Sequence, residues 1–293
     1  MSRQLSLDPY AILASLGING AAQAQPVTGG ADTAIWQVAW RDQRYALRVF
    51  RPEQAGTCEN EVAAMQAAAA GGIPVPEVVR KGVWEGRPVL LLSWIPGKTL
   101  ADQLREHPRL IWPLGKAFGR MQAAIHAIPA PPDMETTRWI EWAGDEPELK
   151  ARLYALPSRK AALLHLDYHS LNVMVQGNQI SGVLDWANAK AGDPRADFAR
   201  TYTILRVEPY SPNGDTLQMA VARRLLERIW RAGYVQAGGR LEDIALFYAW
   251  AGAVMIRDLS PRIGKAGFWL QDCHLDPVRA WRDTWKRRAG IRL

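Results

Sequence analysis

Residues 163–186 read LLHLDYHSLNVMVQGNQISGVLDW. Two short runs in this segment, 173–175 and 180–184, are rich in aliphatic and β-branched residues, and the Gly-Asn pair between them suits a tight turn. In a β-hairpin the residue that enters the first strand lies beside the residue that leaves the second. We therefore expect Asn172 and Asp185 to emerge at the same end of a hairpin, a few ångströms apart.

The loop that precedes this hairpin contains a second acidic residue. Asp167 lies five residues before Asn172. Two carboxylates and one amide oxygen at an open sheet end are hard oxygen ligands of the kind that Mg²⁺ prefers. Phosphoryl transfer needs such ligands to hold a metal ion on the nucleotide phosphates, and a separate carboxylate to orient and deprotonate the attacking hydroxyl. Each residue alone could be an ordinary turn former, but the combined spacing favours phosphoryl transfer.

The wider sequence around these residues carries a family resemblance. The spacing His-x-Asp-x-x-x-x-Asn matches the catalytic loop of protein-kinase-like enzymes. Together HLDYHSLNVM and VLDWANAKAGDPRADFA resemble the aminoglycoside phosphotransferase and choline kinase family, whose usual forms read HGDxHxxNxL and DWExxxxGDPxxDLA. The resemblance covers about residues 20–260 and includes several motifs in the family's order. It implies an α+β, protein-kinase-like fold of two lobes, a small β-rich N-lobe and a larger, mainly helical C-lobe.

The pattern of elements in the first third of the chain is typical of a small sheet with one helix. Residues 34–40 and 45–50 form a predicted hairpin around the polar turn 41–44. Residues 59–70 consist of good helix formers and are followed by two glycines, which predicts a helix that ends there.

A change of pattern marks the boundary between the two predicted lobes. A second hairpin, with its turn at Glu85-Gly86, ends at Pro96-Gly97. We therefore expect an N-lobe over residues 1–95 and a C-lobe over residues 96–293. Beyond the boundary helical patterns dominate, in residues 110–128, in the very apolar run 246–256 and across most of the last third.

The resemblance implies a role for each polar residue of the two motifs. Asp167 would be the catalytic base that receives the substrate hydroxyl proton. His165 would brace the catalytic loop, and Asp197 would hydrogen-bond to the backbone of that loop. The expected catalytic residues are therefore Asp167, His165 and Asp197. Asn172 and Asp185 would be the ligands of Mg²⁺.

Neighbouring polar residues have less specific interpretations. His169 is expected to pack, with an approach to the γ-phosphate as the alternative. His126 lies in a segment, IHAIP, that resembles the family's LHxxP, and it is also expected to pack. The resemblance gives Asp193-Pro194 the turn that follows the metal site.

Two glycines before the first hairpin resemble the family's nucleotide loop. Gly29 and Gly30 lie in VTGGADTAI. Because they lack Cβ atoms, their backbone N–H groups could approach phosphate oxygens closely. A plain hairpin turn is the alternative, and the position directly before a strand favours the nucleotide loop.

An arginine stands where protein kinases carry a lysine. Arg48, in the strand YALRVF, keeps a permanent charge and a bidentate fork for the α- and β-phosphates. The resemblance implies a carboxylate partner on the next helix. We expect this partner to be Glu61, because its spacing to Pro74 fits the family's helix and strand entry better than that of the nearby Glu59. An ordinary surface arginine on an edge strand is the alternative.

The segment LLLSWIPG at the predicted boundary resembles the interlobe hinge of the family. The carbonyl of Ser93 and the N–H of Ile95 are expected to hydrogen-bond the base of the nucleotide, either ATP or GTP. Trp94 stacks on the purine or packs on the core. The alternative interpretation is an apolar strand that simply ends at a Pro-Gly turn.

The composition is that of an ordinary globular protein. Of 293 residues, 48% are hydrophobic and 22% are charged, which excludes wholesale disorder. The N-terminus has no long apolar run of the signal-peptide kind, no stretch is long enough for a membrane span, and the two cysteines build no disulfide framework. We expect a cytoplasmic protein with no membrane partner.

The net charge of +7 is concentrated at the C-terminal end. Residues 201–293 hold 15 Lys and Arg against 9 Asp and Glu. No zinc-finger, RNA-binding or heptad motif accompanies this charge, so no nucleic-acid partner is expected. A basic C-lobe disfavours a polycationic acceptor such as an aminoglycoside, although an acidic cleft around Asp193, Asp197 and Glu208 would reverse that. The C-terminal tryptophans are expected to fill helix interfaces rather than to bind the acceptor.

Taken together, the motifs predict a Mg²⁺-dependent phosphotransferase that moves the γ-phosphate of ATP or GTP to a hydroxyl of a small molecule. A nucleotide-binding pseudokinase is the alternative suggested by Arg48. A basic nucleic-acid-binding protein is a third class, whose affinity would fall steeply with salt. The sequence leaves the acceptor and the oligomeric state open.

Overall fold

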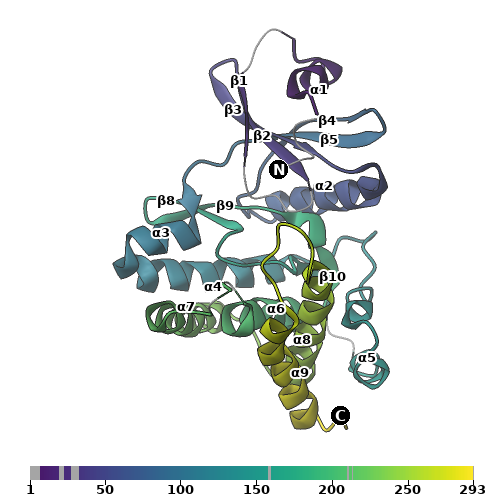
Figure 1. Ribbon diagram of the computed structural model, residues 1–293, viewed down its shortest axis with the longest axis vertical. Coiled ribbons are helices and arrows are strands. Elements are labelled where there is room, and N and C mark those ends of the chain that lie inside the picture. The colour runs from purple at the N-terminus through teal and green to yellow at the C-terminus, as the bar shows by residue number, and fades with distance from the viewer. Residues whose placement is uncertain are drawn as a thin grey trace.

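The computed structural model describes residues 7–19, 23–27, 33–157, 160–209, 211–212 and 214–292. The predicted nucleotide-loop glycines Gly29 and Gly30 lie outside these described residues. A twisted β-sheet with one long helix forms the N-terminal part, and a larger group of helices forms the C-terminal part (Figure 1). The predicted α+β fold of two lobes is confirmed.

The N-lobe sheet has the strand order β1-β2-β3-β5-β4, with every neighbouring pair antiparallel. Its strands are β1 (Gln23–Pro26), β2 (Ala34–Trp40), β3 (Gln43–Val49), β4 (Val78–Trp84) and β5 (Arg87–Ser93). Both hairpins close with two residues of positive φ, Arg41-Asp42 and Glu85-Gly86, as the twist of paired strands requires. The predicted turn over residues 41–44 is therefore too long, because β3 already begins at Gln43.

Two helices cover this sheet. Helix α1 (Pro9–Ser15) contacts β4, and helix α2 (Ala55–Ala70) lies between the sheet and the C-lobe (Figure 1). Helix α2 begins four residues before the predicted start, because the 3₁₀ turn Pro52–Gln54 leads directly into it. It ends at Gly71 as predicted, and Gly72 has a φ of +81°.

The chain passes from the N-lobe to the C-lobe through a turn that requires a glycine. After β5 the chain passes Pro96 and Gly97 and pairs briefly as β6 (Lys98–Thr99) with β8 (Val173–Gln176). Gly97 has a φ of +111°, and a Cβ atom there would overlap the carbonyl oxygen of Val175. Ser181 Oγ donates a hydrogen bond to Pro96 O at 2.8 Å. The boundary after residue 95 stays a prediction.

The C-lobe consists mainly of helices, with a small hairpin on the side that faces the N-lobe (Figure 1). The helices are α3 (Leu100–Glu106), α4 (Ile111–Ala127), α5 (Pro147–Tyr154), α6 (Pro194–Val207), α7 (Leu217–Gln236), α8 (Ala245–Leu259) and α9 (Asp276–Arg288). The hairpin consists of β8 and β9 (Gln179–Val183), and β7 (Ala162–Leu164) pairs with β10 (Lys190–Gly192). Helix α4 packs along α7, and α8 packs between α6 and α9. No helix in the described ranges is both long and apolar enough to cross a bilayer.

The tryptophans of the last third mostly fill helix interfaces, as predicted. Trp230 and Trp250 are fully buried. Trp281 and Trp285 pack on the ring of Tyr248, with ring centroids 5.8 and 4.6 Å away. Trp269 differs, because it is 39% exposed in the loop between α8 and α9.

Candidate active site

The predicted hairpin brings its two end residues together. Val173 pairs with Val183, and Leu184 N–H donates to Asn172 O at 2.8 Å. Asn172 enters β8 and Asp185 leaves β9, so both lie at the same end of the hairpin. Asp185 adopts a left-handed backbone conformation with a φ of +61°, which is uncommon for a residue other than glycine.

A buried aspartate holds the loop before the hairpin in an unusual conformation. Leu166 has a φ of +60°. Asp197, at the first turn of α6, accepts hydrogen bonds from Leu166 N–H at 2.7 Å and from His165 N–H at 3.1 Å. Burial by itself raises the pKa of Asp197, but the hydrogen bond from His126 and these backbone donors lower it below its usual value. A non-glycine residue with this φ is strained, and the Asp197 carboxylate is what holds it.

His165 ties the loop to the end of the hairpin. Its Nε2 donates to Leu184 O at 2.9 Å, and its Nδ1 accepts from Asp167 N–H at 3.3 Å. The side chain is fully buried, and burial lowers the pKa of His165. Both ring nitrogens of His165 therefore bond to backbone groups of the loop and the hairpin.

Asp167 faces a cavity and is strongly acidic. Its side chain is 25% exposed, and its Oδ1 lies 3.7 Å from His169 Nε2. Burial alone raises the pKa of Asp167, but His169, with Arg200, lowers it to about 2. The pKa of His169 is raised in return, because the effect of Asp167 exceeds that of burial. Asp167 is therefore ionised at every ordinary pH, and His169 pairs with it instead of only packing.

The ring of Tyr168 fixes the position of the loop from the core side. Tyr168 stacks on Phe118 of α4 with centroids 4.6 Å apart, and its hydroxyl donates to Phe118 O at 2.8 Å. Because Tyr168 and Asp167 are neighbours, the packing of one against α4 leaves the other turned toward the cavity.

Asn172 and Asp185 fit a hard divalent cation such as Mg²⁺. Asn172 Nδ2 donates to Asp167 O at 3.0 Å, which leaves the Oδ1 atom without a hydrogen bond in the described part of the chain. The Asp185 side chain is 44% exposed. Mg²⁺ usually takes one or two protein oxygen ligands and completes its shell with phosphates and water, so an amide and a carboxylate oxygen suit it.

An ion pair from the N-lobe reaches this cluster. Arg48 Nη1 pairs with Glu61, which is 1% exposed, and Arg48 Nη2 donates to Asp185 Oδ1 at 3.1 Å. Arg48 Nε also donates to Thr33 Oγ1 at 3.1 Å. Burial raises the pKa of Glu61 to about 7 although Arg48 acts to lower it. Glu59 instead pairs with Lys81 at the surface, so the expected partner Glu61 is the one that Arg48 contacts.

The residues expected to bind the base lie at the end of β5. Ser93 N–H donates to Glu77 O at 2.9 Å, and Ser93 Oγ accepts from Glu77 N–H at 2.8 Å. Within the described ranges the N–H of Ile95 makes no hydrogen bond, and Gly182 of β9 leaves room for its side chain. Trp94 N–H donates to Arg44 O at 3.2 Å. The roles of Ser93 and Ile95 stay predictions.

Two residues at this site escaped the sequence interpretation. His126 was expected to pack, but its Nε2 contacts Asp197 Oδ2 at 2.9 Å and its Nδ1 contacts Tyr234 Oη at 2.8 Å. Arg200 is 5% exposed and donates through Nε to Leu166 O at 3.3 Å. Arg200 follows Asp197 by three residues on α6, so the helical spacing alone placed both on one face.

A cavity of about 440 Å³ opens beside Asp167. It is walled by charged side chains and by an apolar group from α6, α8 and the segment that follows α8. The lining residues are Asp167, Asn188, Arg200, Ile204, Glu208, Met255, Arg257, Asp258, Leu259, Pro261, Arg262, Lys265 and Phe268. Its volume is in the range of sites that bind drug-sized ligands.

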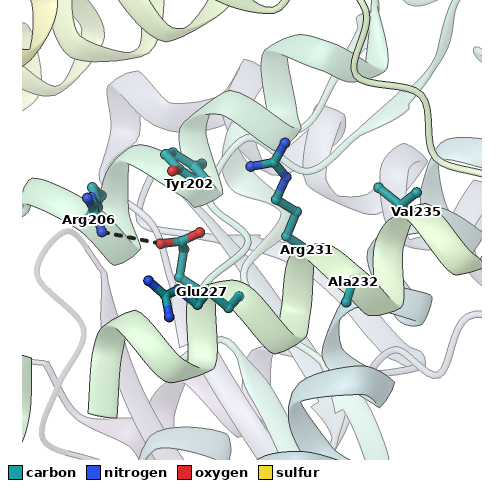
Figure 2. Close-up of a pocket in the computed structure, with 7 residues that line it drawn as sticks. Tyr202, Arg206, Glu227, Arg231, Ala232 and Val235 are labelled. Carbon is teal, nitrogen blue, oxygen red and sulfur yellow. Dashed lines mark hydrogen bonds and ion pairs between the residues drawn. The ribbon is translucent and has the colours of Figure 1, made fainter. Parts of the chain in front are cut away.

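A second cavity, of about 560 Å³, lies between α6 and α7 and shares no lining residue with the first (Figure 2). Glu227 is almost fully buried there, and its Oε2 lies 3.4 Å from Arg206 Nη1. Burial raises the pKa of Glu227, although Arg206 and Arg231 act to lower it.

This raised pKa predicts a pH-dependent stability. Protonated Glu227 stabilises the folded state relative to ionised Glu227. This stabilisation is fully present below the unfolded-state pKa of about 4.3 and is lost as the pH rises through the higher folded-state pKa. Glu227→Gln is neutral throughout, so its free energy of unfolding should rise relative to wild type between about pH 4 and pH 8. Urea unfolding at both pH values measures this, with the exposed Glu135→Gln as control. If the free energies of unfolding of Glu227→Gln and wild type differ by the same amount at about pH 4 and pH 8, the prediction is contradicted.

The fold and the site together define a protein-kinase-like phosphotransferase. The chain belongs to the phosphotransferase enzyme family called APH, whose sequence profile matches residues 23–248. It is therefore an APH-family transferase that acts on a small molecule.

Named relatives differ in their substrates. Viomycin phosphotransferase of Streptomyces vinaceus is 26% identical, with 59% of this chain and 74% of that protein covered. Homoserine kinase of Methylobacillus flagellatus is 25% identical, with 55% of this chain and 57% of that protein covered. Amicoumacin kinase, solved with AMP-PNP and Ca²⁺, shares the fold with a TM-score of 0.66 at 16% identity, over 98% of this chain and 96% of that one.

Proposed function

We propose that this protein transfers the γ-phosphate of ATP to a hydroxyl group of a small acceptor in a Mg²⁺-dependent reaction. The observation that carries the proposal is the convergence of Asp167, Asn172 and Asp185 at one end of the β8–β9 hairpin, with Arg48 of the N-lobe in contact with Asp185. The structure of amicoumacin kinase with AMP-PNP and Ca²⁺ supports a nucleotide donor with a divalent cation.

Each residue has a defined task in this reaction. Asp167 accepts a hydrogen bond from the acceptor hydroxyl, orients its oxygen for in-line attack on the γ-phosphorus and takes its proton as the new O–P bond forms and the bond to ADP breaks. Asn172 and Asp185 would hold Mg²⁺, which when bound offsets the negative charge of the phosphates. Because the pKa of Asp167 is about 2, orientation is its larger contribution and proton transfer comes late.

The N-lobe residues bind the donor. Arg48 would turn its fork to the α- and β-phosphates while Glu61 holds it in place. The carbonyl of Ser93 and the N–H of Ile95 would hydrogen-bond the base. Gly29 and Gly30, which lie outside the described residues, would complete the proposed nucleotide site.

A thermal-shift titration with ATP and with GTP, each with and without Mg²⁺, tests the donor site. A ligand at 100 times its Kd adds about 2.7 kcal/mol to the stability of the folded state. For a chain of this size that corresponds to about 5–10 °C in Tm. We expect a shift with ATP that needs Mg²⁺. The absence of a shift with either nucleotide would contradict the proposal.

Asp185→Asn should remove the dependence on Mg²⁺ in this titration. The substitution deletes the negative charge that the cation needs while it keeps the shape of the side chain. The exposed Asp133→Asn is the matched control and should behave as wild type. Retention of a full Mg²⁺-dependent shift in Asp185→Asn would exclude this residue as a metal ligand.

A pseudokinase is the second candidate, and the bond from Arg48 to Asp185 is the observation that favours it. A guanidinium that stays on the metal ligand would allow nucleotide to bind without turnover. Release of ADP in an acceptor screen separates the two: turnover excludes the pseudokinase. Binding of ATP with no turnover in the wild type, restored in Arg48→Lys, would establish it.

A further inference from the structure

The cavity beside Asp167 lacks the acidic character that a polycationic acceptor would need. Of the three acids that might have formed an acidic cleft, only Glu208 lines the cavity. Asp193 pairs with Arg195, with Nη2 to Oδ2 at 2.6 Å, and Asp197 is fully buried against the catalytic loop.

The cavity wall also holds Asp167, the proposed base, and Asp258, which is already neutralised by two arginines. Asp258 Oδ2 accepts from Arg200 Nη2 at 3.0 Å, and its Oδ1 accepts from Arg257 Nε at 2.8 Å. An ammonium group of a ligand would have to compete with both guanidinium groups for this carboxylate.

Two cations in the wall have no such neutralising partner. Arg262 ends the 3₁₀ turn Ser260–Arg262, and Lys265 follows it in the loop that rises from α8 toward the N-lobe (Figure 1). Within the described residues neither makes an ion pair. The guanidinium of Arg262 lies 5.8 Å from the ring centroid of Phe268, which also lines the cavity.

We propose that the acceptor carries an anionic group, a carboxylate or a phosphate, in addition to the hydroxyl that is phosphorylated, and that Arg262 and Lys265 bind this group. This inference rests on the proposed function, because Asp167 must orient the hydroxyl at the same cavity. A guanidinium offers a carboxylate or phosphate two parallel hydrogen bonds, and an ammonium adds a second charge. The net positive C-terminal third steers such an acceptor toward the cavity.

Four sugar derivatives of similar size test the charge preference. Gluconate carries a carboxylate, glucose 6-phosphate a phosphate, glucose no charge and glucosamine an ammonium group. Each is titrated into the protein saturated with Mg²⁺ and AMP-PNP, up to about 10 mM, because millimolar Kd values are expected for such fragments. We expect gluconate or glucose 6-phosphate to bind more tightly than glucose, and glucosamine to bind most weakly. The two anionic members distinguish a carboxylate from a phosphate preference.

The variant Arg262→Gln/Lys265→Gln should lower the affinity for the anionic members by about tenfold or more, as loss of hydrogen bonds to a charged group requires. Arg287→Gln/Arg292→Gln removes the same charge from exposed positions in the last turn of α9 and just beyond it, and should leave the affinities unchanged. The affinity for Mg²⁺ and AMP-PNP should be equal in all three proteins. Both substituted cavity residues are at least partly exposed, so the fold is expected to persist, and the Tm of each variant verifies this.

Three results would overturn the inference: glucosamine that binds as tightly as gluconate, an unchanged preference in Arg262→Gln/Lys265→Gln, or no saturable binding of either anionic member. Weaker binding of AMP-PNP in that variant, with the sugar preference unchanged, would assign the two cations to the nucleotide and also overturn it. The thermal shift with Mg²⁺ and AMP-PNP, measured without a sugar, tests the proposed function. The sugar titrations test the anionic acceptor, so the two proposals can fail separately.

Discussion

Asp167→Asn is expected to lower turnover by about 10²–10⁴-fold, the usual loss when a positioned base is removed. The amide has the shape of the carboxylate, but it cannot take the proton of the acceptor hydroxyl and it presents a donor where an acceptor is needed. Nucleotide affinity should change little, because Asp167 lines the cavity that is proposed to bind the acceptor. ADP release in the presence of a turned-over acceptor gives the rate, and the thermal shift with ATP and Mg²⁺ gives the binding.

The comparison with Asp133→Asn separates chemistry from general effects of charge. This exposed aspartate should keep wild-type turnover when it is replaced. Full activity in Asp167→Asn would exclude the proposed base. A loss of nucleotide binding equal to the loss of turnover would instead place Asp167 in the donor site.

Asp197→Ala should destabilise the protein by about 3–5 kcal/mol, since it leaves buried polar partners without their carboxylate. The orphaned groups are the N–H groups of His165 and Leu166 and the ring of His126. For a protein of this size, the Tm should fall on the order of 10 °C. The strained backbone of Leu166 should relax, so activity falls in the molecules that remain folded.

The pH dependence of this loss gives a second readout. Because the pKa of Asp197 is below its usual value, its stabilising effect is present above the unfolded-state pKa of about 3.9 and is lost as the pH falls through the folded-state value. The difference between wild type and Asp197→Ala should therefore shrink in acid. Urea unfolding at neutral and at low pH measures it. A small, pH-independent difference would show that the carboxylate does not hold the loop.

Much of the site geometry was predictable because it depends on local spacing. Asn172 and Asp185 share one end of a hairpin whose turn and strands are evident from residues 173–184. The contact of Arg48 with Glu61 was expected from the family resemblance, and it joins a strand to the helix that follows it. In such cases the partners lie within one supersecondary unit, so the sequence pattern already contains the geometry. The catalytic and binding roles of these residues stay predictions.

Other parts depend on contacts between distant segments. His126 reaches Asp197 from a helix 71 residues earlier, and a lone histidine on an apolar helix gives no sign of that partner. Arg262 and Lys265 join Asp167 only through the packing of α8 beside α6. The short turn at Arg41-Asp42 was missed because two non-glycine residues adopt positive φ there.

The bond between Arg48 and Asp185 spans 137 positions of the chain and joins the two lobes. If Asp185 holds the metal as proposed, a divalent cation that arrives alone competes with an internal counter-ion. A nucleotide offers Arg48 other oxygens and so releases the carboxylate. Metal and nucleotide would then promote each other's binding, because each removes a competitor of the other.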